Sequence, residues 1–184
     1  MNLEQTIEQL KNGGTILYPS DTIWGLGCDA TNEEACQRIL ALKNRPEDKS
    51  FIVLVDSIGM LEKYVPDFHQ VCYDLIDYAE KPLTIIYPSA KGLAPSVLAK
   101  EGTIGIRITK DPTCLKLIRS MHKPLVSTSA NLSGQANPKS FKEIDESIKS
   151  GVDAVLELRL EEQMTSPSQI IKISLDGSVV VIRQ

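Results

Sequence analysis

At 184 residues, with 42% hydrophobic and 24% charged residues, the chain has the size and composition of one globular domain with a sizeable core. Its formal net charge of −4 at pH 7 disfavours a generally basic nucleic-acid binder, although a local basic patch stays open. No apolar run approaches the roughly 18 residues that a membrane helix needs, and Met1–Glu4 lack the basic and apolar regions of a signal peptide.

The first half of the chain alternates helical spacing with apolar runs. The predicted elements are a helix over 3–10 that Gly13-Gly14 ends, a strand over 15–18, a helix that Thr31 or Asn32 caps and Pro46 ends, a strand over 51–55, and helices over 57–64 and 67–78. The unbroken apolar run over 51–55 is typical of a strand buried on both faces.

Strands dominate the second half. The predicted elements are strands over 83–87 and 103–108 with a loop over 88–102 between them, a helix over 111–121, a strand over 124–126, a helix near 141–148, a strand near 154–158, and strands over 169–173 and 179–182 joined by a turn at Asp176-Gly177. This order predicts an α/β fold: a single domain over 1–184 with a twisted, mixed β-sheet and flanking helices.

The cysteines and histidines point away from metal or thiol chemistry. Cys28, Cys36, Cys72 and Cys114 are scattered without a CxxC pair, and the two histidines lie far apart. This spacing indicates neither a zinc site nor a disulfide framework, and no G-x-S-x-G motif is present. We expect a cytoplasmic protein in a reducing compartment, with no metal bound by the chain itself and no membrane partner.

The stretch Ser127-Thr128-Ser129-Ala130-Asn131-Leu132-Ser133-Gly134 follows a short apolar run and is rich in hydroxyl and amide side chains. Such a cluster contributes little to a core, because each buried hydroxyl or amide needs its own partner. One interpretation is a Ser/Asn turn between two elements. The other is a ligand-binding loop at the carboxyl end of a strand, where open α/β sheets bind ligands.

A second polar turn, from Pro19 to Gly27, contains the one tryptophan of the chain and two glycines. We expect Gly25 and Gly27 to let the backbone approach a ligand closely. Although residues 25–30 match G-x-G-x-x-A, a dinucleotide fingerprint follows its strand directly and opens a helix. Here the glycines are separated from both, so a Rossmann site is rejected.

Three cations, Lys43, Arg45 and Lys49, lie within seven residues at the end of a predicted helix. They are either a solvated helix terminus, where the dipole favours cations, or a clamp for a polyphosphate. Arg107 lies in an apolar strand, so it needs an anionic partner, either an internal acid or a substrate carboxylate. Arg183, at the end of the last strand, has the same ambiguity.

Taken together, these segments resemble the YrdC/Sua5/TsaC family of L-threonylcarbamoyladenylate synthases, from about Gly14 to Arg183. The matching pieces are Pro19-Ser20-Asp21-Thr22-Ile23-Trp24-Gly25-Leu26, the K-x-R-P run at 43–46 with Lys49, Pro82-Leu83-Thr84, Gly102-Thr103-Ile104-Gly105-Ile106-Arg107, and the stretch over 127–134. The S-x-S-A-N-x-S-G element combined with an upstream K-x-R-P is specific, whereas either motif alone is modest support.

The resemblance implies a reaction in which L-threonine, bicarbonate and ATP become threonylcarbamoyl-adenylate and pyrophosphate. The product serves t6A modification of tRNA, with downstream transfer proteins as further partners. Mg²⁺ is expected to accompany ATP, held mainly by phosphate oxygens and water. The implied fold is a twisted α/β sheet with a deep concave cavity.

The resemblance also assigns roles to individual residues. Arg45 and Lys49 are expected to contact the ATP phosphates and to act in catalysis. The other nucleotide-side positions are Lys43, Thr103, Ser129, Asn131, Asn137 and Arg183. The threonine-side positions are Thr22, Arg107, Ser127 and Ser168, with Arg107 as the partner of the amino-acid carboxylate.

The chain departs from the family pattern at several positions. Leu54 replaces a histidine that some members carry, Glu80-Lys81 precede Pro82 where Pro-Gly is common, and residues 161–169 replace a Gly-rich loop. Two alternatives to the synthase stay open: a non-catalytic RNA-binding factor acting on tRNA or ribosome assembly, and a carbamoyl-transfer module with another amine acceptor. Overall acidity and the 5% aromatic content argue against strong RNA binding.

Overall fold

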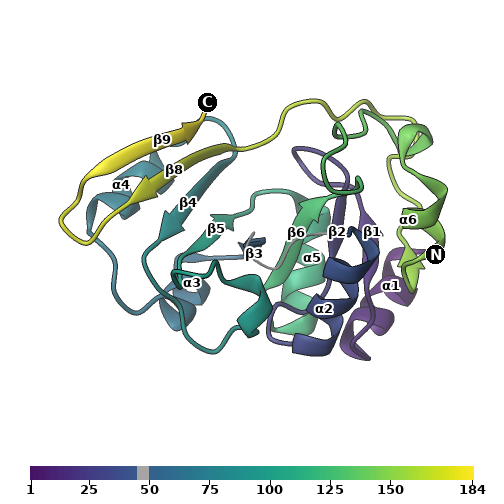
Figure 1. The fold of residues 1–184 in the computed structure, drawn as a ribbon, viewed down its shortest axis with the longest axis horizontal. Helices are drawn as coiled ribbons and strands as arrows, with labels where there is room; N and C mark the ends of the chain where they lie inside the picture. Colours follow the sequence, from purple (N-terminus) through teal and green to yellow (C-terminus); the bar gives the residue numbers. More distant parts are fainter. Residues whose placement is uncertain (45–49) are drawn as a thin grey trace.

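A computed structural model describes residues 1–44 and 50–184 (Figure 1). The helices are α1 (Leu3–Lys11), α2 (Glu33–Leu42), α3 (Ile58–Tyr64), α4 (Val71–Asp77), α5 (Pro112–Met121) and α6 (Glu146–Ser150), with short 3-10 turns η1 (Pro95–Val97) and η2 (Phe141–Glu143). The strands are β1 (Ile16–Tyr18), β2 (Gly25–Gly27), β3 (Ile52–Val55), β4 (Leu83–Tyr87), β5 (Ile104–Ile108), β6 (Leu125–Ser129), β7 (Ala154–Val155), β8 (Gln169–Ile173) and β9 (Val179–Arg183).

Side-chain caps explain where the longer helices begin. The side chains of Asn2, Asn32 and Asp111 each accept a hydrogen bond from the backbone N–H three residues later, at 2.9, 3.1 and 2.9 Å. These bonds satisfy N–H groups that have no partner within the helix. Left-handed residues, Asn44 and His122, follow α2 and α5, which is a common way for a helix to end.

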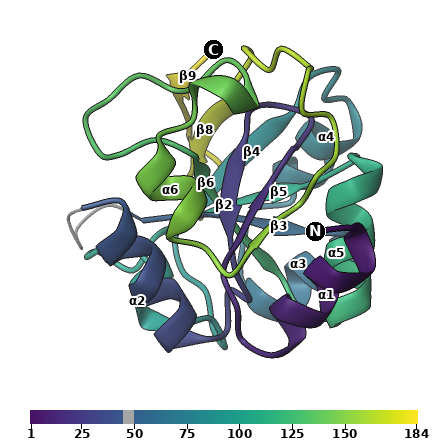
Figure 2. The same ribbon diagram turned by 90° about the vertical axis from the view of Figure 1, so that its right-hand side faces the viewer.

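Within the described residues, the strands form one nine-stranded sheet in the order β7-β1-β2-β6-β3-β5-β4-β8-β9. The pairs β1–β7, β3–β5 and β4–β8 are parallel, and the others are antiparallel. The prediction of a mixed α/β sheet with flanking helices is therefore confirmed. Helices α1 and α5 pack on one face of the sheet, and α2 lies on the other (Figure 2).

Strand β2 corrects the prediction for the glycine turn. Gly25–Gly27 form a strand between β1 and β6, not a loop. A Cβ on Gly27 would lie 2.5 Å from the carbonyl oxygen of Val126 and 2.7 Å from the ring of Tyr18. Gly27 is therefore needed for the close approach of neighbouring strands and the buried Tyr18 ring. Gly25, at the start of the same strand, does line the cavity described below, whereas Gly27 does not.

Three other expectations change in detail. The helix predicted near 141–148 is divided into η2 and α6. The division falls at Asp145, whose side chain caps the start of α6. The strand predicted near 154–158 has only two residues, Ala154–Val155. Strand β6 continues to Ser129, so the first residues of the polar stretch are strand and not turn.

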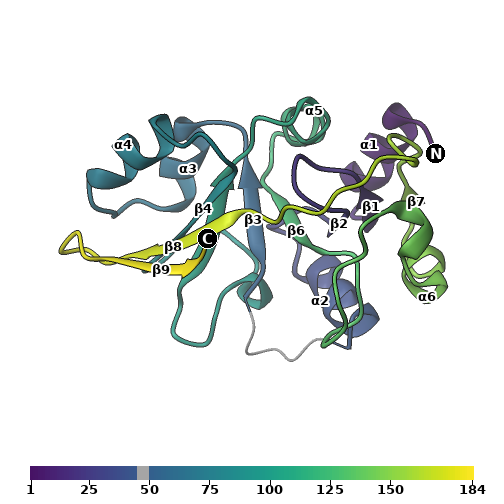
Figure 3. The same cartoon turned by 90° about the horizontal axis from the view of Figure 1, so that it is seen from above.

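The segment over 156–168 runs across the molecule from β7 to β8 (Figures 1 and 3). Arg159 anchors it by an ion pair to Asp111 at 2.9 Å, and Met164 is buried in the main core. Its last residue, Ser168, lies against β4, where its hydroxyl is 2.8 Å from that of Thr84. None of the helices described here has the length and apolar character to cross a membrane.

Candidate functional site

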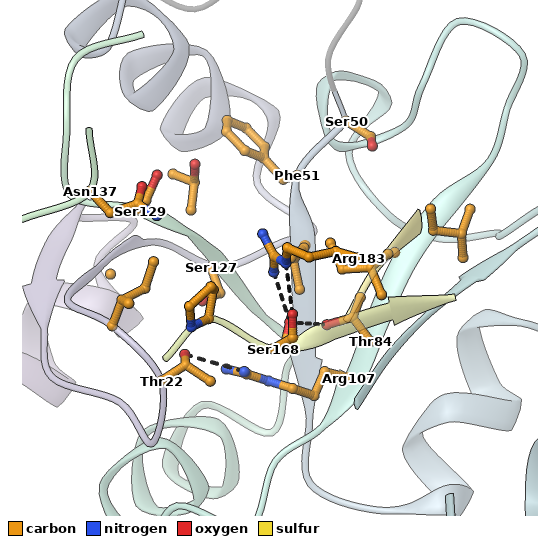
Figure 4. A pocket seen from close by; sticks show the side chains of 18 residues that line it. Thr22, Ser50, Phe51, Thr84, Arg107, Ser127, Ser129, Asn137, Ser168 and Arg183 are labelled. Carbon is orange, nitrogen blue, oxygen red and sulfur yellow. Dashed lines mark hydrogen bonds between the residues drawn. The ribbon is translucent and has the colours of Figure 1, made fainter. Parts of the chain in front are cut away.

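Strands from distant parts of the sequence surround a cavity of about 290 Å³, close to the lower size of small-molecule sites, about 300 Å³ (Figure 4). Strands β3, β4, β5 and β6 supply its central walls, the 22–25 segment closes one side, and the β8–β9 hairpin closes the other. Its lining residues include Thr22, Ser50, Phe51, Thr84, Arg107, Ser127, Ser129, Asn137, Ser168 and Arg183.

Arg107 is the most buried charge in this cavity, with 3% of its side chain exposed. Its guanidinium lies 3.3 Å from a carboxylate oxygen of Asp21 and donates to the hydroxyl of Thr22 at 3.3 Å. Its Nε has no hydrogen-bond partner among the described residues. The internal acid that the strand context requires is therefore Asp21, while the same guanidinium also lines the cavity.

Arg183 reaches the cavity from the end of β9. Its Nε donates to the carbonyl oxygen of Ser168 at 2.8 Å, and its Nη2 donates to the Ser168 hydroxyl at 3.2 Å. The same hydroxyl lies 2.8 Å from that of Thr84 in β4. Figure 4 shows the guanidinium groups of Arg183 and Arg107 on either side of Ser168. Thr84, Ser168 and Arg183 therefore tie β4 to the C-terminal hairpin.

The described lining is positively charged, because Arg107 and Arg183 are its charged members and Asp21 lies behind Arg107. Burial and, after it, the positive charge of Arg107 lower the pKa of Arg183. Two neighbouring guanidinium groups and one carboxylate leave an excess of positive charge. Since charged hydrogen bonds in partly buried sites are strong, this arrangement favours an anion that contacts both groups.

Seven of the predicted site residues line this one cavity: Thr22, Arg107, Ser127, Ser129, Asn137, Ser168 and Arg183. Three others do not line it. Lys43 is buried beneath the 129–133 segment, Asn131 donates to the carbonyl oxygens of Leu132 and Gln135, and the Thr103 hydroxyl donates to Glu101 at 2.9 Å. Arg45 and Lys49 lie outside the described residues.

The cavity also contains residues to which the sequence assigned no role. Thr84 and Ile86 are two positions apart along β4, and Gly105 and Arg107 are two positions apart along β5. Phe51 directly precedes β3. Because alternate residues of a strand face the same side of a sheet, the position of Arg107 is a signal for Gly105. No comparable signal exists for Phe51, whose place depends on the sheet order. Leu54, a departure from the family pattern, is buried against α5 instead.

The fold and the cavity define an α/β protein with a cationic, hydroxyl-lined pocket, whose charge suits a small anionic ligand. The family model of Sua5, YciO and YrdC, which has the description "Telomere recombination", matches residues 8–184. The chain belongs to this family.

Two sequence relatives are both named threonylcarbamoyl-AMP synthase. The protein of Pseudoalteromonas translucida is 36% identical over 173 residues, which are 92% of this chain and 91% of the relative. A protein of Vibrio cholerae is 39% identical over 138 residues, which are 73% of each chain. The resemblance that the motifs indicated is therefore confirmed at the level of the family.

Solved structures show the same fold. Escherichia coli YciO is 25% identical, with a TM-score of 0.83 over 99% of this chain and 88% of its own. A doubly substituted Sua5 of P. abyssi is 23% identical, with a TM-score of 0.89 over 98% of this chain. This chain spans 55% of that Sua5 chain, so it corresponds to about half of the longer protein.

Proposed function

We propose that this protein is a threonylcarbamoyl-AMP synthase, which converts L-threonine, bicarbonate and ATP into threonylcarbamoyl-AMP, pyrophosphate and water. The observation that carries the proposal is the placement of Arg107 and Arg183 in one cavity with the hydroxyl groups of β6. The names of relatives that align over most of the chain support it. A P. abyssi Sua5 of the same fold, with a TM-score of 0.84, has a structure with L-threonine.

The two ends of the cavity suit the two substrates. Arg107, positioned by Asp21 and Thr22, binds the carboxylate of L-threonine, because a guanidinium forms two parallel bonds to a carboxylate. Ser127 and Ser168 complete the threonine side. Arg183, Ser129 and Asn137 serve the nucleotide side, and Arg45 and Lys49 contact its phosphates and act in catalysis.

Catalysis in this arrangement depends on fixed charge. Transfer of the adenylyl group builds negative charge on the α-phosphate and on the leaving pyrophosphate. Cationic and hydrogen-bonding groups that are already in place stabilise this charge without reorganisation. The carbamate of threonine is short-lived in water, so a cavity that encloses it favours its capture by ATP.

Mg²⁺ enters this proposal as part of the ATP complex. The described lining contains hydroxyl, amide and guanidinium groups but no carboxylate, and no cluster of three potential ligands occurs in the described residues. These groups fit a metal ion that phosphate oxygens and water hold. We also propose one domain over 1–184, a cytoplasmic location, and transfer of the product to tRNA by partner proteins.

The test is pyrophosphate release from ATP and Mg²⁺ with bicarbonate, with and without L-threonine, together with mass spectrometry of the nucleotide product. We expect threonine-dependent release and threonylcarbamoyl-AMP. Folded protein without this release would contradict the proposal, and salt-sensitive tRNA binding without ATP turnover would favour the RNA-binding alternative. Release with a different amino acid in place of L-threonine would indicate another amine acceptor.

A further inference from the structure

Lys43 is a charged residue in the interior of the protein. It caps the carboxyl end of α2, its backbone N–H donates to the carbonyl oxygen of Ile39 at 3.1 Å, and Asn44 follows in the left-handed conformation. Only 1% of the residue is exposed. A lysine is rarely buried to this extent unless its ammonium has acceptors, so its contacts identify what it does.

The Lys43 ammonium contacts the turn after β6. The Lys43 ammonium donates to the carbonyl oxygens of Ser129 and Asn131, and the side-chain oxygen of Asn131 lies at 3.5 Å. The carbonyl oxygen of Lys43 accepts a hydrogen bond from the backbone N–H of Ser133 at 2.9 Å. Lys43 therefore holds the first, third and fifth residues of one five-residue turn, 129–133.

The same turn forms part of the cavity. The side chain of Ser129 lines the cavity while its carbonyl oxygen binds Lys43, and the N–H of Ala130 donates to the carbonyl oxygen of Trp24 at 3.0 Å. Lys43 itself is not a lining residue. The ammonium of Lys43 therefore contacts the backbone of a residue whose side chain lines the cavity, without lining the cavity itself.

We propose that Lys43 is a positioning residue, which fixes the 129–133 turn so that Ser129 faces the substrates, and not a ligand of the ATP phosphates. This inference rests on the proposed function for its consequence in turnover, but its structural part holds without any substrate. It gives the K-x-R-P motif two separate tasks, because Lys43 points into the protein while the residues after Asn44 belong to the predicted phosphate clamp.

The structural part is tested in the free protein with Lys43→Met, which keeps the length of the side chain and removes the ammonium. We expect hydrogen exchange of the Ala130 amide to rise roughly tenfold, because local opening becomes easier when the carbonyl anchors are lost. The fluorescence of Trp24, the one tryptophan, should change with it. Lys123→Met is the matched control: Lys123 bonds Asp29 and Thr31 at the surface.

The functional part uses the same variants in the pyrophosphate assay. For Lys43→Met we expect turnover to fall about tenfold. The salt dependence of ATP binding should keep the wild-type slope, because no phosphate contact is lost. Lys43→Arg should fail to restore turnover, since a planar fork does not fit the acceptors of a single ammonium. If the wild-type protein lacks threonine-dependent release, the proposed function fails while the exchange result still decides the role of Lys43.

A measurement on the wild-type protein covers the case in which the variants do not fold. Acylation of lysines, followed by mass spectrometry, should leave Lys43 unmodified both with and without ATP, whereas Lys123 reacts in both states. Labelling of Lys43 in the free protein with protection by ATP would overturn the inference. Unchanged Ala130 exchange in a folded Lys43→Met protein, with a shallower salt slope for ATP binding, would overturn it as well.

Discussion

Two walls of the cavity differ in how their strands are held: one is formed by the central strand β6 and the other by the β8–β9 hairpin at the edge of the sheet. Strand β6 lies between β2 and β3 in the middle of the sheet, and its backbone is paired on both sides. Strand β9 is an edge strand, paired with β8 alone, and its residues Val179–Ile182 are 47–57% exposed. Both walls nevertheless present polar groups to the same ligand space.

The difference shows two ways to hold a functional side chain. On the β6 wall, neighbouring strands and the buried Lys43 fix the backbone that carries Ser127 and Ser129. On the hairpin wall, β9 is largely exposed, so the hydrogen bonds that Arg183 donates to Ser168 must position its guanidinium. Substitutions on the β6 wall should therefore change the stability of the fold. Substitutions on the hairpin wall should instead remove single contacts without a large change in stability.

The largest effect is expected for Arg107, the buried charge in the cavity. Arg107→Ala should lower kcat/KM for L-threonine by roughly a hundredfold, because a charge-assisted bond worth about 1.5–3 kcal/mol is lost and Asp21 is left without its partner. Steady-state pyrophosphate release checks this. Arg119→Ala is the control, since Arg119 is 63% exposed and its pair with Asp56 spans 3.5 Å. Equal kinetics for both variants would contradict the assignment.

The next effect is on stability beneath the β6 wall. Gly27→Ala should lower the free energy of unfolding by about 2–3 kcal/mol, because the added Cβ meets the Val126 carbonyl and the Tyr18 ring in a well-packed region. Gly59→Ala in α3, where a Cβ meets nothing within 4 Å, should raise it by up to about 1 kcal/mol. Urea unfolding measures both, and a neutral Gly27→Ala would mean that these strands can separate.

A smaller effect, on turnover, is expected for Ser168 on the hairpin wall. Ser168→Ala removes the hydroxyl between Thr84 and Arg183, so turnover should fall by roughly five- to tenfold, the equivalent of one hydrogen bond of about 1 kcal/mol. If Ser168 acts by positioning Arg183, the double variant with Arg183→Ala should be no slower than Arg183→Ala alone. Additive losses would instead indicate that Ser168 contacts substrate independently.

The smallest effect is expected on the exposed strand. Val181→Thr should change the free energy of unfolding by less than about 0.5 kcal/mol, because Val181 is 57% exposed and threonine suits a strand. The same change at Val53, fully buried in β3, should cost about 1–3 kcal/mol, since a hydroxyl would be buried there. Similar losses at both positions would show that another surface covers β9.

Most elements could be predicted from local patterns. The helix over 33–42 follows from its Asn cap and apolar spacing, and the strand over 51–55 from its apolar run. Strand β2 could not be predicted, because glycines weaken strands and only pairing with β1 and β6 makes Gly25–Gly27 one. The same holds for the serines of β6, where the predicted strand ended too early. Pairing with the neighbouring strands, and not the propensity of serine, makes these residues a strand.

The sequence by itself determined the alternation of helices and strands, the residue types of the cavity and the family, because these depend on patterns within short segments. Only the tertiary structure decided that seven of the predicted side chains share one cavity, that Lys43 points into the protein and that Ser168 binds Arg183. Such contacts join residues that are far apart in the chain, for example Lys43 and Asn131, which are 88 positions apart. The order of strands in the sheet sets these distances, and no local spacing encodes them.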